Sequence, residues 1–201
     1  MTGHDPLAFD EATHTYTYRG KVVPSVTQIL APLSNLDMVP SITLAAASAF
    51  GTATHLACEL DDLGELDEGS LDPGLKPVLH AWRQFSLEHD VRWTGIEQRV
   101  YHPTLRYAGT LDRCGWVDGE MAIVDIKTST SLYPVMGLQL AAYAQAEMKP
   151  TAKRYVVQLK TDGTYVLQPY TDPNDWPTFA SLVTLRNWCV QHHVTPRFKE
   201  N

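Results

Sequence analysis

The sequence predicts an α/β (α+β) fold, in which a mixed central sheet is flanked by helices and preceded by an N-terminal hairpin and helices. The first observation is a change of period: apolar residues recur at helical spacing between residues 73 and 89, and strand patterns follow from about residue 92. The second is composition, since 44% of the 201 residues are hydrophobic and 19% are charged. Such a chain can bury a sizeable hydrophobic core.

The first ninety residues predict a hairpin followed by helices. Side-chain character alternates over residues 14–18, a turn is expected at Arg19-Gly20, and the chain resumes as a strand at Val22-Val23. Ser25 is placed to cap a short helix that runs to Leu30. Two longer helices are expected, one over residues 41–63 and one from Asp72-Pro73 to about residue 89.

The second half of the chain predicts the sheet. We expect, in order, strands over 92–101, 105–117 and 120–128, a helix over 134–148, a strand over 155–159, a turn at 162–163, a strand over 165–167 and a last helix over 175–192. This order of elements predicts a mixed sheet that is flanked by helices on both faces.

Net charge and cysteine content limit the possible functions. The formal charge of −7 comes from residues 59–72, which hold seven acidic side chains and no basic one, so the rest of the chain is balanced. This argues against a purely charge-driven nucleic-acid binder but does not exclude an anionic partner at another surface. Three separated cysteines, with no CxxC pair, favour a reduced setting without a thiolate metal cluster.

The longest nearly apolar run, residues 42–50, is too short to cross a bilayer, and the first fifteen residues resemble no secretory leader. We therefore expect a cytoplasmic protein with no membrane partner.

The turn at Asp118-Gly119 fixes a register. A two-residue type I′ hairpin loop needs positive φ at both positions, which Asp-Gly supplies. The numbers of facing residues then sum to 237, so Val117 faces Glu120 and Asp112 faces Asp125. The turn thus predicts two carboxylates side by side.

Lys127 is expected on the same face of its strand as Asp125, because side chains alternate along a strand. Two acids and one lysine would then meet on an otherwise apolar strand, and the repulsion between the acids calls for a positive partner. A hard divalent cation is the natural candidate. An ion-pair network in which Lys127 neutralises one aspartate is the alternative that the tripeptide alone leaves open.

Four further features point to the same patch: Glu97 on the preceding strand, a close backbone approach at Gly109, Gln139 and Tyr143 on one helix face, and His55 on the earlier helix. Each alone has a simpler explanation, as a surface acid, a core histidine or an amphipathic tyrosine. The densest basic stretch supplies three candidate contacts to a DNA backbone, although a solvated surface explains them equally well: Lys149, Lys153 and Arg154.

Together these residues resemble the PD-(D/E)XK nuclease superfamily, and within it the RecB-like exonuclease branch. The resemblance covers about residues 50–160 and rests on Gly51-Thr-Ala-Thr-His55, Glu97, Gly109-Thr-Leu-Asp112, Asp125-Ile-Lys127 and Gln139-Leu-Ala-Ala-Tyr143. The opening of the chain, from His14 to Leu30, also resembles small stand-alone phage members and mitochondrial genome maintenance exonucleases. Leu111 replaces the proline of the motif name, and the missing cysteine set implies that there is no iron–sulfur cluster.

The resemblance implies a restriction-endonuclease-like core in a single nuclease domain, with the hairpin and helices in 1–90 and the active site in 91–201. It implies hydrolysis of phosphodiester bonds in linear DNA with Mg²⁺ or Mn²⁺, in phage-type recombination, repair or DNA processing, with a single-strand annealing or helicase partner. The implied metal ligands are His55, Asp112, Asp125 and the carbonyl of Ile126. Lys127 would position the attacking water, and Gln139 and Tyr143 would orient the lysine or contact DNA. Glu97 would be a further catalytic residue.

Two alternatives remain open at this point. A structure- or sequence-specific endonuclease would use the same metal site on a different form of DNA. A catalytically silent module that binds DNA or a partner protein would keep the fold without the chemistry.

Overall fold

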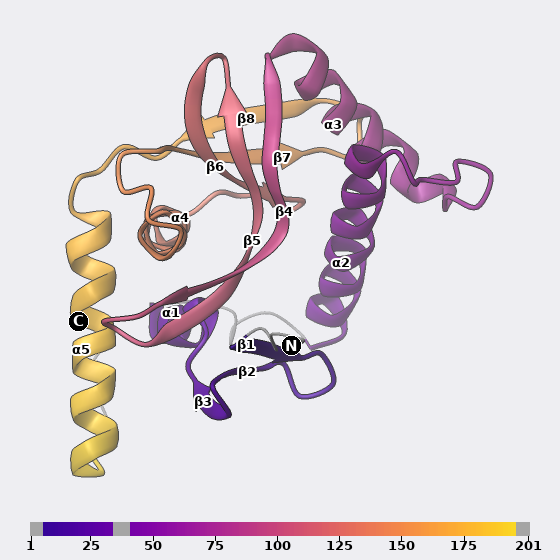
Figure 1. The fold of residues 1–201 in the computed structure, drawn as a ribbon. Helices are drawn as coiled ribbons and strands as arrows, with labels where there is room; N and C mark the ends of the chain where they lie inside the picture. Colours follow the sequence, from indigo (N-terminus) through magenta and orange to yellow (C-terminus); the bar gives the residue numbers. More distant parts are fainter. Residues whose placement is uncertain (1–5, 34–40, 196–201) are drawn as a thin grey trace, which may run out of the picture.

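The computed structural model describes residues 6–33 and 41–195 (Figure 1). A three-stranded antiparallel sheet contains β1 (Leu7–Asp10), β2 (Thr15–Tyr18) and β3 (Lys21–Val23). A five-stranded mixed sheet has the order β4 (Val91–His102), β5 (Tyr107–Val117), β6 (Glu120–Lys127), β7 (Lys153–Leu159) and β8 (Tyr165–Pro169). The helices are α1 (Val26–Leu30), α2 (Ser41–Leu63), α3 (Lys76–Glu88), α4 (Val135–Ala146) and α5 (Asp175–His192).

Helices cover both faces of the five-stranded sheet, which confirms the predicted architecture. Figure 1 shows α1, α4 and α5 on one side and α2 and α3 on the other. One core cluster joins Leu140 of α4 and Phe179 of α5 to Ile123 of the sheet, and a second joins Trp82 of α3 to Val124 and its neighbours. Adjacent residues of β6 therefore pack on opposite faces, as strand geometry requires.

The predicted register of the β5–β6 hairpin is confirmed. Asp118 and Gly119 have φ values of 51° and 80°, and the paired residues run from Val117–Glu120 to Arg113–Val124. The ladder ends there, one position before Asp112 and Asp125, so the predicted pairing of these two residues is not part of it and stays a prediction. Beyond β6, helix α4 crosses over to β7, which pairs with β6 in parallel.

The N-terminal sheet packs against the strands that lead to the predicted site. Ser25 forms the expected capping box with Gln28 at the start of α1. The Tyr16 hydroxyl lies 2.8 Å from Oγ1 of Thr110 in β5. The strand β1 was not predicted, because four residues at the edge of a small sheet carry little pattern of their own.

Several element ends differ from the sequence-based expectation by a few residues, and backbone conformation explains two of them. Strand β5 begins at Tyr107 rather than residue 105, because Arg106 adopts a positive φ in the preceding turn. Helix α4 ends at Ala146 rather than residue 148, because Met148 also adopts a positive φ. None of the described helices combines the length and apolar character that crossing a membrane requires.

A single glycine controls how closely α4 approaches β5. A Cβ atom added at Gly109 would lie 2.7 Å from Cε1 of the buried Tyr143, whereas one added at Gly51 in α2 would meet only Oγ1 of Thr128 at 3.8 Å. We expect Gly109→Ala to lower the free energy of unfolding by about 1–3 kcal/mol, as overpacking does. Gly51→Ala should be neutral or stabilising. Urea unfolding measures both, and equal effects of the two substitutions would contradict this packing.

Candidate active site

Asp125 carries a carboxylate in the apolar centre of the sheet. The residue is 1% exposed, and Lys127 Nζ lies 2.6 Å from its Oδ2. The other carboxylate oxygen, Oδ1, has no hydrogen-bond partner among the described residues. A buried charge with so few partners costs free energy unless another positive group compensates it.

The protonation of this pair follows from burial and charge. Burial raises the pKa of Asp125 to about 6, although Lys127 counteracts this rise and Asp112 adds to it. Burial alone would lower the pKa of the Lys127 ammonium, but attraction to Asp125 and Asp112 outweighs burial and leaves that pKa raised. Lys127 is therefore a permanent cation at this site.

His55, Glu97 and Asp112 converge from three elements. His55 Nδ1 lies 3.6 Å from Asp112 Oδ2 and 3.5 Å from Glu97 Oε1. One possible ligand atom from each residue lies within 4.8 Å of the other two. Asp112 Oδ2 also accepts a hydrogen bond of 2.7 Å from the backbone N–H of Ile126, which ties the carboxylate to β6. The sequence-predicted His55, Glu97 and Asp112 are thus brought together.

The electrostatic potential at this cluster favours a cation. Asp112 is the main cause of a rise in the pKa of His55 to about 9; burial opposes the rise and Glu97 adds to it. An imidazole nitrogen and carboxylate oxygens, with the unpartnered Oδ1 of Asp125 nearby, form a donor set that suits a divalent ion. The residues present therefore fit the metal that the resemblance implies.

The carbonyl of Ile126 has a different contact from the one expected. It lies 3.1 Å from His55 Nε2. A histidine that binds a metal through one nitrogen commonly donates its other N–H to a backbone carbonyl, which fixes the tautomer. This contact orients His55 Nδ1 towards Asp112 and Glu97, and the ligand role of Ile126 stays a prediction.

The strands are irregular where Glu97 and Asp112 face each other. These two residues fall between the pairs Ile96–Arg113 and Gln98–Leu111, and Glu97 has a φ of 44°, in the left-handed region. On β5 the strict alternation of faces breaks, because both Asp112 and Arg113 contact residues of α2. Backbone strain of this kind persists only where the surrounding contacts hold it.

Arg113 supplies those contacts, and sequence analysis did not identify it. The side chain is fully buried; its Nε donates to Asp62 Oδ2 at 2.7 Å and its Nη1 to Glu97 Oε1 at 3.1 Å. The guanidinium also lies over the ring of Trp82. An arginine inside an otherwise apolar strand was the available signal, but its partner Asp62 lies 51 positions away.

Gln139 and Tyr143 share one face of α4, as their spacing predicts, and Gln139 Nε2 donates to the Tyr143 hydroxyl at 3.3 Å. Burial raises the pKa of Tyr143 well above its ordinary value, and Asp125 and Asp112 add to the rise. The phenol therefore stays protonated beside the carboxylates.

The basic stretch already has acidic partners within the chain. Arg154 pairs with Asp175 at 2.7 Å, Lys149 with Glu147 at 3.0 Å, and Lys153 lies 3.4 Å from Glu120. Lys153 is level with Ala122, three residues before Asp125, which is roughly 10 Å along the strand. Contact of these residues with DNA stays a prediction.

The chain matches known proteins only in the comparison with solved structures. No family model and no curated protein matches the chain. Among solved structures, one described as LHK-Exo in complex with dAMP superposes with a TM-score of 0.42 and 14% sequence identity, covering 85% of this chain and 89% of that one.

Removing the Arg113 guanidinium should destabilise the protein strongly. In Arg113→Met the carboxylates of Asp62 and Glu97 lose their buried cation, at an expected cost of about 3–5 kcal/mol in the free energy of unfolding. Arg83 is the matched control: it pairs with Asp61 but its side chain is 40% exposed, so Arg83→Met should cost less than about 1 kcal/mol. Chemical denaturation of both variants tests the difference, and equal costs would refute the assigned role of Arg113.

Proposed function

We propose that the chain is a metal-dependent DNA exonuclease that hydrolyses phosphodiester bonds with Mg²⁺ or Mn²⁺. The observation that carries this proposal is the buried Asp125 carboxylate, which is paired with Lys127 through Oδ2 and has no hydrogen-bond partner at Oδ1 among the described residues. A purely structural ion pair would satisfy both carboxylate oxygens. A carboxylate left open next to His55, Glu97 and Asp112 favours a bound cation instead.

Four side chains would hold the metal: His55, Glu97, Asp112 and Asp125. A bound divalent cation would act as a Lewis acid on a phosphate oxygen and lower the pKa of a water molecule. The hydrogen bond from the Ile126 N–H keeps the Asp112 carboxylate fixed before substrate arrives. The Ile126 carbonyl holds the tautomer of His55 in which Nδ1 faces the carboxylates.

Lys127 acts as a fixed positive charge and not as a general base. Its raised pKa keeps the ammonium protonated, so it would orient the attacking water and stabilise the negative charge that develops on the phosphate. Its contact with Asp125 holds the flexible side chain at the site. Tyr143, itself protonated, would donate towards the same patch, with Gln139 fixing its hydroxyl.

The choice of DNA as substrate rests on the resemblance of the motifs, as does a cytoplasmic setting in phage-type recombination, repair or DNA processing. The same resemblance suggests a single-strand annealing or helicase partner that would deliver the linear DNA.

Metal binding should stabilise the folded protein. At about one hundred times its dissociation constant, Mn²⁺ would add about 2.7 kcal/mol to the free energy of unfolding, which is roughly 5–10 °C in Tm. Asp125→Ala should lose this shift, and the exposed control Asp162→Ala should keep it. Thermal melts with Mn²⁺ and with EDTA measure the effect. An identical Mn²⁺ shift in Asp125→Ala would argue against the site.

Cleavage should depend on the charges of Asp125 and Lys127. We expect Asp125→Ala and Lys127→Ala to lower the rate on DNA by about 10²–10³-fold or more, because each removes charge stabilisation that is needed in the transition state. Lys160→Ala, at an exposed position, should retain the wild-type rate. The measurement is a gel time course on end-labelled linear and closed circular DNA with Mg²⁺ or EDTA, with circular dichroism to confirm folding.

The outcomes separate the remaining functions. Loss of linear DNA with circles intact supports the exonuclease and gives its polarity from the labelled end. Nicked or linearised circles would replace it with an endonuclease. Full activity in both active-site variants would overturn the proposed active site. No cleavage of any DNA would overturn the nuclease function and favour a silent binding module.

A further inference from the structure

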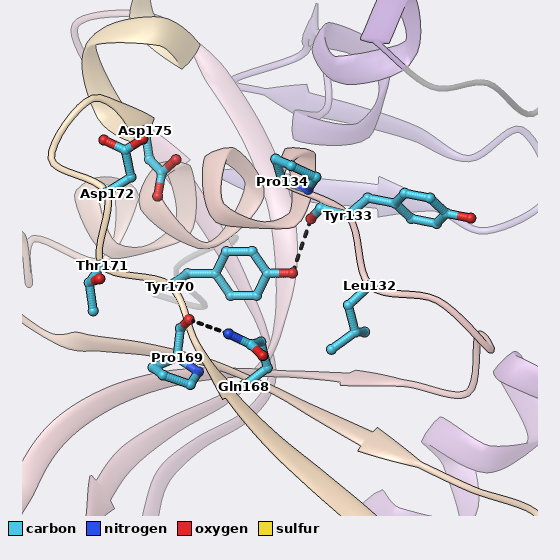
Figure 2. A pocket seen from close by; sticks show the side chains of 9 residues that line it. All are labelled: Leu132, Tyr133, Pro134, Gln168, Pro169, Tyr170, Thr171, Asp172 and Asp175. Atoms are coloured by element: carbon cyan, nitrogen blue, oxygen red, sulfur yellow. Dashed lines mark hydrogen bonds between the residues drawn. The ribbon is translucent and has the colours of Figure 1, made fainter.

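A pocket of about 350 Å³ lies beside the candidate active site (Figure 2). Two connections form it: the one from β6 to α4, which contributes Leu132 and Tyr133, and the one from β8 to α5, which contributes Tyr170 and Asp172. Gln168 lines it from the end of β8. Its volume is at the small end of the range for ligand pockets, which suits a single ring system.

The sheet register places this pocket near Asp125. Asp125 of β6 pairs with Val156 of β7, and Val156 pairs with Gln168 of β8. Residues paired in this way share a face of the sheet, and adjacent strands lie about 4.8 Å apart, so Gln168 lies roughly 10 Å from Asp125 on the same face. The pocket is therefore within reach of a nucleotide adjacent to a phosphate at Asp125.

The Tyr170 ring is held in a defined position in the pocket. Its hydroxyl donates to the Tyr133 carbonyl at 3.0 Å and so links the two connections. Figure 2 shows the ring extending towards that carbonyl, with Leu132 on the same connection as Tyr133. Burial raises the pKa of the Tyr170 phenol, and Asp125 adds to the rise, in agreement with their proximity.

The lining excludes a phosphate and favours a neutral, flat group. The described residues that line the pocket include no lysine or arginine, and two of them are aspartates. Asp175 is paired with Arg154, and Asp172 accepts hydrogen bonds from Asn174, so both carboxylates are already engaged. An aromatic ring beside a leucine and two prolines offers stacking and apolar contact.

We propose that this pocket holds one unpaired nucleobase of the strand whose phosphate lies at Asp125 and Lys127, stacked on Tyr170. The inference rests on the proposed nuclease function and extends it to the form of the substrate. The pocket lies between two chain connections and is open to solvent, and a base stacked there on Tyr170 would have left its pairing partner. The enzyme would therefore act on single-stranded DNA or on an end that has frayed.

The test uses oligonucleotides with one abasic residue, which leave the protein unchanged. An abasic residue at one position next to the cleaved bond should raise KM for wild-type enzyme by about tenfold or more, since stacking of one base is worth that much. The same residue several nucleotides further along should have no effect. A fully paired, blunt duplex should be cleaved more slowly than the same strand alone.

Substitutions of Tyr170 test whether the pocket causes the effect of the abasic residue on KM. Tyr170→Ala should raise KM for intact DNA by a similar factor and lose its sensitivity to the abasic residue, because both changes remove one interaction. Tyr170→Phe keeps the ring but loses the hydrogen bond to the Tyr133 carbonyl, so KM should rise less than in Tyr170→Ala and the sensitivity to the abasic residue should remain. Leu132→Ala gives an independent test that leaves the tyrosine in place. Trp188→Ala, at a 52% exposed residue of α5, is the control and should be unaffected.

Each outcome bears on the proposal. If wild-type enzyme cleaves intact DNA and no abasic position changes KM, or if Tyr170→Ala and the abasic residue act additively, the nucleobase site is refuted while the nuclease function stands. If wild-type enzyme cleaves no DNA at all, the proposed function fails and this inference fails with it.

Discussion

A charged carboxylate in the middle of an apolar strand is the constraint on which the rest of the site depends. Asp125 is buried, and Lys127 is the cation directly beside it on its own strand. Helix α2 brings His55 to the same point, and the hairpin brings Asp112. Asp112 raises the negative potential at Asp125 and, with Glu97, at His55, so the described part of the site favours a positively charged partner.

A second layer of contacts makes this arrangement possible. The buried Arg113 binds Glu97 on one side and Asp62 of α2 on the other, which couples the helix to the two irregular strands. Gly109 allows Tyr143 to approach the same strands from the opposite helix layer. The site is thus positioned by a packed framework, as precise chemistry requires.

Local patterns account for what the sequence could predict. The Asp118-Gly119 turn defines its own register, alternation places Asp125 and Lys127 on one face, and a four-residue spacing aligns Gln139 with Tyr143. The positive φ of Glu97, the partner of Arg113 and the contact between Ile126 and His55 depend on residues far apart in the chain. No local pattern contains that information. The pocket at Tyr170 could not be predicted either, because it is formed by two connections that are separated in the chain.

The most direct test of the account is a crystal structure of the protein grown with Mn²⁺ and measured at the manganese absorption edge. We expect an anomalous peak beside the four proposed ligands, His55, Glu97, Asp112 and Asp125. The peak should be absent from crystals of Asp125→Ala treated in the same way. A saturating Mn²⁺ concentration that leaves this position empty, with Lys127 still paired to Asp125, would show that the cluster is a structural ion-pair network and would contradict the central claim.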